Sequence, residues 1–367
     1  MHRRLFLAVT LCLILAGCNQ DQRMLERIGY IETAAFDAAP QDKIKATISM
    51  PLVTQFARDG KTTDELLETI STSPKDAKAA LSLRTSRIIV SGQIRTFMYG
   101  EALARQGLWK DMDTFLRDPS ISFRTAMAVV EGEAGAIISQ EYPRHTKTAN
   151  YVNKMLQKEF NKQSVPRTAL YQFTRDYYDD GMDPIAIMVK EQKKDITISG
   201  IATFRDDKMI DKLPWKDVYL FSLLYQNLSQ GEFSLTSEDP NLKAISFRAV
   251  RSKRRIKVSK GPSGEYEADI YLKVEGGVEE YFGQAKLSTD ERAKVEKLVS
   301  EHIVMESLRI IKTLQQNRTD SLGLGKYVRN KMSYEEWKRT DWHEQFSQMP
   351  IRVHCSFYMK NFGAYFD

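Results

Sequence analysis

The stretch Ala268-Asp269-Ile270-Tyr271-Leu272-Lys273-Val274-Glu275 alternates between aliphatic residues and charged or aromatic ones, which predicts a half-buried strand. The longest helical pattern in the chain follows it and opens with the capping box Ser288-Thr289-Asp290-Glu291. The apolar positions that lie close to one stripe of this helix are Val295, Val299, Ile303, Ile310 and Leu314. The C-terminal part is therefore predicted to combine a sheet with one long helix.

The same two patterns recur along the rest of the chain. Alternation or short apolar runs predict strands over 28–36, 44–52, 87–90, 126–130, 196–204, 242–258 and 351–359. Helical spacing and helix-start residues predict helices over 63–71, 74–83, 101–105, 109–117, 152–160, 169–178 and 215–228. Because strands and helices alternate without the regular spacing of βαβ units, we expect an α+β protein with largely antiparallel sheets.

These elements group into about three mixed α/β domains of an elongated chain. An N-terminal domain is expected over 25–184 and ends in the loop Asp179-Asp180-Gly181-Met182-Asp183-Pro184. A middle domain is expected over 185–260 and a C-terminal domain over 261–367.

The N-terminus carries a targeting pattern. The charges His2-Arg3-Arg4 precede an apolar run over 5–16, which is too short to span a membrane and is typical of a signal peptide. Leu15-Ala16-Gly17-Cys18 resembles a bacterial lipobox, which implies a signal peptide over 1–17, a lipid on Cys18 and a tether over 18–24. An ordinary signal peptide with an incidental cysteine is the alternative. Two or more acyl chains would hold the folded body close to the outer face of a membrane.

Composition excludes several classes of protein. The net charge is +6, and Arg3 and Arg4 leave with the signal peptide, so there is no case for nucleic-acid binding. Cys12 is removed with the signal peptide and Cys18 carries lipid, which leaves Cys355 as the remaining thiol. An intramolecular disulfide is therefore not expected, and stability must come from packing.

The usual catalytic motifs are missing from the sequence. It contains no H-E-x-x-H, no G-x-S-x-G and no G-x-x-x-x-G-K-[ST]. His354 and Cys355 are adjacent, but neighbours on a strand point to opposite faces, so Cys355 is expected to be a core residue and not a nucleophile. The run Gly323-Leu324-Gly325-Lys326 lacks the spacing of a phosphate loop and is expected to be a helix-ending turn. We expect no cofactor and no enzymatic activity.

Two groups of side chains are weighed as metal ligands. Asp179, Asp180 and Asp183 could bind calcium, although three carboxylates in such a turn are more often a solvated loop. His302 and Glu306 are one helical turn apart, but two ligands do not make a site. No metal site is predicted.

A basic row is the most informative surface feature. Arg251, Lys253, Arg255 and Lys257 alternate, so a strand places all four on one face, while Ile256 and Val258 face the other way. A solvated sheet face is one interpretation. The other is a contact with anionic headgroups or with an acidic partner protein.

Several segments, taken in order, resemble one family, the Ger(x)C spore germination lipoproteins, which are the C subunits of nutrient germinant receptors. The segments that carry the resemblance are Ser86-Arg87-Ile88-Ile89-Val90, Gly100-Glu101-Ala102-Leu103-Ala104-Arg105-Gln106-Gly107, Phe115-Leu116-Arg117-Asp118-Pro119, Ile198-Ser199-Gly200-Ile201-Ala202-Thr203-Phe204 and Asp320-Ser321-Leu322-Gly323-Leu324-Gly325. Trp337, Trp342, Phe346, Pro350 and Ile351 then follow in the family's order.

The chain departs from the family at a few positions. Asn19-Gln20 stand where many relatives carry Trp-Asp after the lipidated cysteine, and Ser321 stands for a proline. Tyr30-Ile31-Glu32-Thr33-Ala34 replaces the usual glycines of the first strand. The resemblance holds over the rest of the chain despite these departures.

The resemblance implies a three-domain lipoprotein on the outer face of the spore inner membrane. It would act with a membrane-embedded A subunit and a transporter-like B subunit in nutrient-triggered germination, without catalysis. No ligand-binding residue carries over, because Gly200, Gly323 and Gly325 are expected to serve the backbone, and Trp337 and Trp342 to pack the last domain. The alternative function is a free-standing extracytoplasmic lipoprotein that binds a solute or acts on a wall component.

Overall fold

The computed structural model describes residues 27–52, 64–140, 142, 148–193, 195–236, 243–262, 264–282 and 289–360. The expected signal peptide, Cys18 and the tether lie outside the described residues, as does Ser288, the first residue of the expected capping box. Within the described part, no helix is long and apolar enough to cross a membrane.

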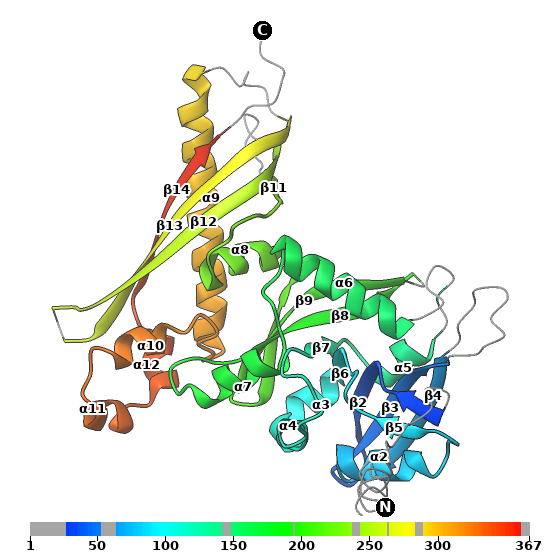
Figure 1. Cartoon of the computed structure of the whole chain (residues 1–367). Helices are drawn as coiled ribbons and strands as arrows, with labels where there is room; N and C mark the ends of the chain where they lie inside the picture. Colours follow the sequence, from blue (N-terminus) through cyan, green and yellow to red (C-terminus); the bar gives the residue numbers. More distant parts are fainter. Residues whose placement is uncertain are drawn as a thin grey trace, which may run out of the picture.

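An eight-stranded sheet forms the larger part of the fold (Figure 1). Its strand order is β10-β9-β8-β7-β6-β2-β3-β4. The bounds in that order are Lys208–Pro214, Asp195–Arg205, Ile185–Gln192, Ala126–Val130, Thr96–Gly100, Thr33–Ala39, Lys43–Pro51 and Asp64–Ser71. β2, β6, β7 and β8 run parallel to one another, and the strands at both ends are antiparallel. A separate parallel pair joins β1 (Ile28–Tyr30) to β5 (Ile88–Val90).

Helices cover both faces of this sheet, and β7 shows why. All five residues of β7 are buried, with Met127 and Val129 in one hydrophobic cluster and Ala126, Ala128 and Val130 in another. A strand buried on both faces has to be apolar throughout. The first cluster includes α2 (Pro74–Ser82), α3 (Glu101–Gln106), α4 (Trp109–Leu116) and α7 (Leu170–Tyr178). The second includes α5 (Ala134–Ser139), α6 (Thr148–Lys162) and α8 (Trp215–Tyr225).

A four-stranded sheet makes up the second body, in the order β11-β12-β13-β14. Its strands are Phe233–Thr236, Ala244–Lys260, Tyr266–Phe282 and Ile351–Met359. The long helix α9 (Thr289–Gln316) lies along one face of it in Figure 1, and the predicted stripe of α9 is buried from Val295 to Leu314. Three short helices follow α9, namely α10 (Leu324–Arg329), α11 (Tyr334–Arg339) and α12 (Trp342–Gln348).

The α+β class is confirmed, and three details differ from expectation. Residues 63–71 were expected to form a helix, but 64–71 form β4, the edge strand that pairs with β3. The expectation of largely antiparallel sheets holds at both ends of the large sheet and fails at its parallel centre. Strands β6, β8, β10 and β11 and helices α5 and α12 were not predicted.

The sheets also cross the expected domain boundaries. β7 pairs with β8 across residues 184 and 185, and β12 pairs with β13 across residues 260 and 261. A division at either point separates hydrogen-bonded strands. A grouping by sheets places β8, β9 and β10 with the N-terminal part, and β11 and β12 with the C-terminal part.

Candidate functional site

The predicted basic row lies on the exposed face of the four-stranded sheet. Arg251, Lys253, Arg255 and Lys257 are all exposed on β12, and Ile256 is buried on the other face. Arg254 also points inward, where it donates to the Leu224 carbonyl and burial lowers its pKa. The alternation expected from the sequence is therefore confirmed. The row runs along an open face, opposite the face that carries the core residues.

Aromatic side chains lie beside this row on β13 and β14. The Lys257 ammonium lies 5.2 Å from the ring centre of Tyr271, and Lys273 lies 5.3 Å from that of Tyr358. His354 stacks on Tyr271 with ring centres 4.6 Å apart. These contacts between cations and rings fix the long side chains on the sheet surface.

The carboxylates of the same face form hydrogen bonds and ion pairs with basic side chains outside the row. Arg352 bonds Asp269 at 2.9 Å and Glu267 at 2.9 Å, and His354 bonds Asp269 at 2.7 Å. Hydrogen bonds from Arg352 and His354 lower the pKa of Asp269 to about 2. Glu275 lies within 2.6 Å of Lys360 and 3.5 Å of Lys273.

This pairing leaves the β12 side of the face positive. Among the described residues, Arg251, Lys253 and Arg255 make no ion pair. Their positive charges are therefore available to an anionic surface, which binds them through long-range attraction and counterion exchange. Such a face has the chemistry of a docking surface and not that of a catalytic centre.

Cys355 and His354 do not form a nucleophilic pair. Cys355 is half-buried on the core side of β14 and His354 is exposed on the other side, as the strand period predicts. Burial raises the pKa of the Cys355 thiol to about 12, so the thiolate is scarce at neutral pH.

The three aspartates of the 179–184 loop do not converge on a cation site. Arg329 bonds both Asp179 and Asp180, and Trp337 Nε1 donates to Asp180 Oδ2 at 2.9 Å. Asp183 accepts from the Asp320 amide at 2.6 Å and lies 3.1 Å from His343 Nε2. No group of three metal-ligating side chains occurs in the described ranges. These carboxylates instead join the N-terminal part to the C-terminal helices.

Asp320 is the centre of that joint. It is fully buried and accepts hydrogen bonds from the amides of Leu324 at 3.0 Å and Gly325 at 2.7 Å, and from Trp342 Nε1 at 3.1 Å. Burial raises its pKa to about 6. The turn that follows opens α10, whereas a helix-ending turn was expected.

Both glycines of this turn meet the backbone requirement expected of them. Gly323 has a φ of 71°, which a side chain disfavours. A Cβ on Gly325 would lie 2.7 Å from the Gly181 Cα, so the two backbones touch there. The rings of Trp337 and Trp342 pack with centres 5.7 Å apart, which confirms their predicted packing role.

The helical pair His302 and Glu306 forms no metal clip either. Glu306 bonds Arg309 at 2.7 Å, and Arg309 also bonds the buried Asp217 of α8 at 2.5 Å and 3.1 Å. This arrangement ties α9 to α8 and leaves Glu306 already engaged.

Both parts of the chain are similar to known proteins. Residues 21–191 match the spore germination protein N-terminal domain, and residues 199–363 match the spore germination B3/GerAC-like C-terminal domain. This chain belongs to the GerC-type family of spore germination proteins. It is 22% identical to the spore germination protein GerQC of Bacillus cereus over 352 residues, which cover 96% of each chain. The crystal structure of the GerBC protein has the same fold, with a TM-score of 0.57, 16% identity, and coverage of 92% of this chain and 100% of that one.

In this GerC-type protein three of the segments that carried the resemblance, 100–107, 198–204 and 320–325, lie at structural junctions. In the 100–107 segment, Arg105 bonds Glu101 within α3 and donates to the Ile210 carbonyl of β10 at 3.0 Å. Gly200 lies on β9 opposite Pro214 of β10, where a Cβ would collide with the Leu213 carbonyl. Asp320 to Gly325 form the joint described above. These contacts explain the motifs by packing and assign no ligand to them.

Proposed function

We propose that this chain is the lipid-anchored, non-catalytic subunit of a spore nutrient germinant receptor, and that it is needed for nutrient-triggered germination. Family membership over nearly the whole chain supports the germination role. The lipobox at Cys18 supports attachment to the outer face of the spore inner membrane. The A and B subunits of the receptor are its proposed partners.

The open basic face is the main support for the proposed contact role. A sheet face with three cations in a row that form no ion pair with any described residue, and with aromatic rings beside them, suits an anionic surface. Either anionic headgroups or an acidic region of a partner subunit supplies that surface.

The anchor is tested by Cys18→Ala. We expect the protein to leave the membrane fraction of spores and nutrient germination to fall to the level of a deletion strain. Germination by a non-nutrient trigger serves as the control, because it bypasses the receptor. A variant that stays membrane-bound and fully functional would show that partner contacts hold the chain there without lipid.

The basic face is tested by Arg255→Glu combined with Lys257→Glu. Both side chains are exposed, so we expect unchanged yield and a change in stability within about 0.5 kcal/mol, with impaired nutrient germination. Lys154→Glu with Lys208→Glu, two exposed changes on the other sheet and its helices, is the matched control. Normal germination in the first pair would rule out this contact.

Two further measurements separate the sources of the anionic surface and the alternative function. Vesicles with and without phosphatidylglycerol report headgroup binding, and co-purification from spore membranes reports partner subunits. A free-standing lipoprotein that binds a solute or acts on the wall would leave nutrient germination intact on deletion, which the receptor function does not allow.

A further inference from the structure

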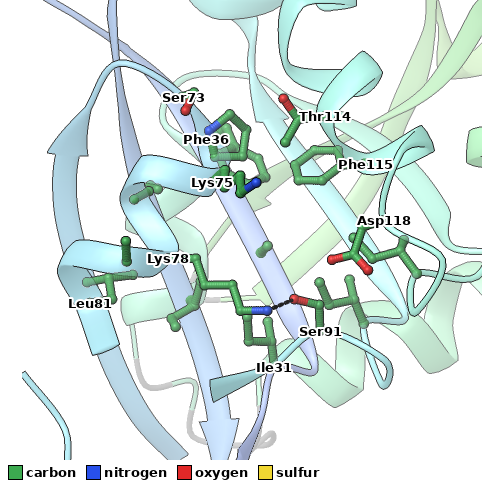
Figure 2. A pocket seen from close by; sticks show the side chains of 18 of the residues that line it. Ile31, Phe36, Ser73, Lys75, Lys78, Leu81, Ser91, Thr114, Phe115 and Asp118 are labelled. Atoms are coloured by element: carbon green, nitrogen blue, oxygen red, sulfur yellow. Dashed lines mark hydrogen bonds between the residues drawn. The ribbon is translucent and has the colours of Figure 1, made fainter. Parts of the chain in front are cut away.

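A pocket of about 700 Å³ lies in the N-terminal part, between α2, α4 and the inner face of β2 and β3. Figure 2 shows its interior, with the rings of Phe36 and Phe115 at one side and Lys78 reaching across to Ser91. The segment 117–121 and the residues Ser91 and Ile94 close the remaining side. None of these residues belongs to the basic face or to the joint around Asp320.

The walls of the pocket are apolar and well ordered by packing. Phe97 stacks on Phe115 with ring centres 4.3 Å apart, and Phe36 lies 5.4 Å from the same ring. Aliphatic side chains, among them Ile31, Ile48, Leu81 and Ile121, line the rest of the wall. A concave, largely apolar site of this volume with a few polar groups is the usual form of a small-molecule site.

Positively charged side chains outnumber negatively charged ones in the lining of the pocket. Asp113 is paired with Arg117 at 2.8 Å, and Asp118 accepts from the Ser120 amide at 2.9 Å and its hydroxyl at 2.6 Å. Asp118 is then the one carboxylate of the lining that no arginine pairs with. Lys75 and Lys78 both face this carboxylate, so the lining residues keep an excess of one positive charge.

Lys78 and Ser91 are hydrogen-bonded to each other, and both have donor hydrogens left over. Lys78 Nζ donates to Ser91 Oγ at 2.8 Å, and Ser91 is 4% exposed. The Ser91 oxygen accepts in this bond, so its own hydroxyl hydrogen has no acceptor among the described residues. Lys78 Nζ has three hydrogens, and among the described residues Ser91 is its one hydrogen-bond partner. Neighbouring donors that face an apolar space call for an acceptor, and a charged acceptor forms the stronger bond.

We propose that this pocket binds a small apolar monocarboxylate. Its carboxylate accepts from Lys78 Nζ and the Ser91 hydroxyl, and its apolar body lies against Phe36 and Phe115. A single negative charge fits best, because the anionic Asp118 lines the same pocket and would repel a dianion more strongly than a monoanion. The proposal is independent of the partner contacts in the receptor.

The binding test uses the full-length chain in lipid nanodiscs, with empty nanodiscs as the blank. Three water-soluble probes share one apolar body, namely 3-phenylpropanoate, 3-phenylpropan-1-ol and 3-phenylpropylamine. Titration followed by saturation-transfer NMR should rank the acid first, the alcohol second and the amine last. An amine that binds as tightly as the acid would overturn the proposal, as would a lack of saturable binding by the acid.

Two variants locate the site. Lys78→Met keeps the length and the apolar stem, so the chain should fold, and affinity for the acid should fall at least about tenfold while the alcohol is little affected. Ala46→Leu fills the pocket and should weaken both probes, and Lys154→Met on the distant α6 should change neither. Acid affinity unaffected by Lys78→Met would refute the assignment. A phospholipid retained in the pocket, seen by native mass spectrometry and not displaced by the acid, would also refute it.

Discussion

At the residue scale, the joint around Asp320 shows that partners far apart in the sequence determine the role of a side chain. When only the loop is considered, calcium binding is one interpretation of Asp179, Asp180 and Asp183. Their partners lie 137 to 160 positions away, at Asp320, Arg329 and His343. Nothing local indicates those partners, so the sequence could not decide between a metal, solvent and a structural role. The basic row and the Cys355 orientation were predictable, because the strand period alone fixes them.

The joint should make the protein less stable as the pH rises. Burial raises the pKa of Asp320 from 3.8 to about 6, and the hydrogen bond to Asp183 raises that of His343 above 6.5. At these two groups the folded state binds more protons than the unfolded state, so their contribution to stability is greatest below the unfolded pKa values and is lost as the pH rises through the folded values. The Asp320 part alone corresponds to a loss on the order of 1 kcal/mol between pH 5 and 8.

Urea unfolding at several pH values measures this effect. The groups that face His343 are Asp183, Asp206 and Arg205, and none of them is changed in the test. Asp320→Asn and His343→Gln should each flatten the pH dependence, and the double variant should remove most of it. If the double variant keeps the slope of the wild type, other groups cause it.

At the element scale, α9 and β4 explain which parts of the fold could be predicted. α9 has a long apolar stripe that its own sequence displays, so its helix and its buried face follow from the period. β4 contains Asp-Glu-Leu-Leu-Glu, which favours a helix, yet it forms eight ladder pairs with β3. Pairing with a neighbouring strand overrides weak local preference. All of β6 and the first five residues of β8 are buried, so neither strand shows the alternation of buried and exposed residues that the period detects.

Two positions on α9 separate packing from helix propensity. Ile303 is fully buried and Met305 is 57% exposed on the same helix. Ile303→Ala should reduce the free energy of unfolding by about 3 kcal/mol, because it leaves a cavity against the core of the second sheet. Met305→Ala should change it by no more than about 0.5 kcal/mol. Denaturant unfolding of both variants checks this, and equal effects would mean that α9 does not pack through this face.

At the scale of the whole molecule, the two sheets share one hydrophobic core. The same cluster includes Ala35 of β2, Leu223 of α8, Ile303 of α9 and Met359 of β14. The boundaries expected at 184 and 260 therefore divide strands that belong together, because local composition shifts do not reveal which strands pair. A continuous core predicts that the two sheets unfold as one cooperative unit.

The contact between Gly181 and Gly325 should control that cooperativity. Gly325→Ala places a Cβ 2.7 Å from the Gly181 Cα and 2.6 Å from Trp342 Nε1, so the joint has to open. Overpacking of this kind costs about 1–3 kcal/mol. We expect the single transition to separate into two, with the four-stranded sheet losing protection at lower denaturant than the eight-stranded sheet. Hydrogen exchange of peptides from β3 and β13, followed by mass spectrometry, distinguishes the two. Gly92→Ala is the control, since its Cβ would meet the Ser120 carbonyl at an ordinary 3.4 Å. If Gly325→Ala shifts both peptides together, the shared core couples the sheets without help from the joint.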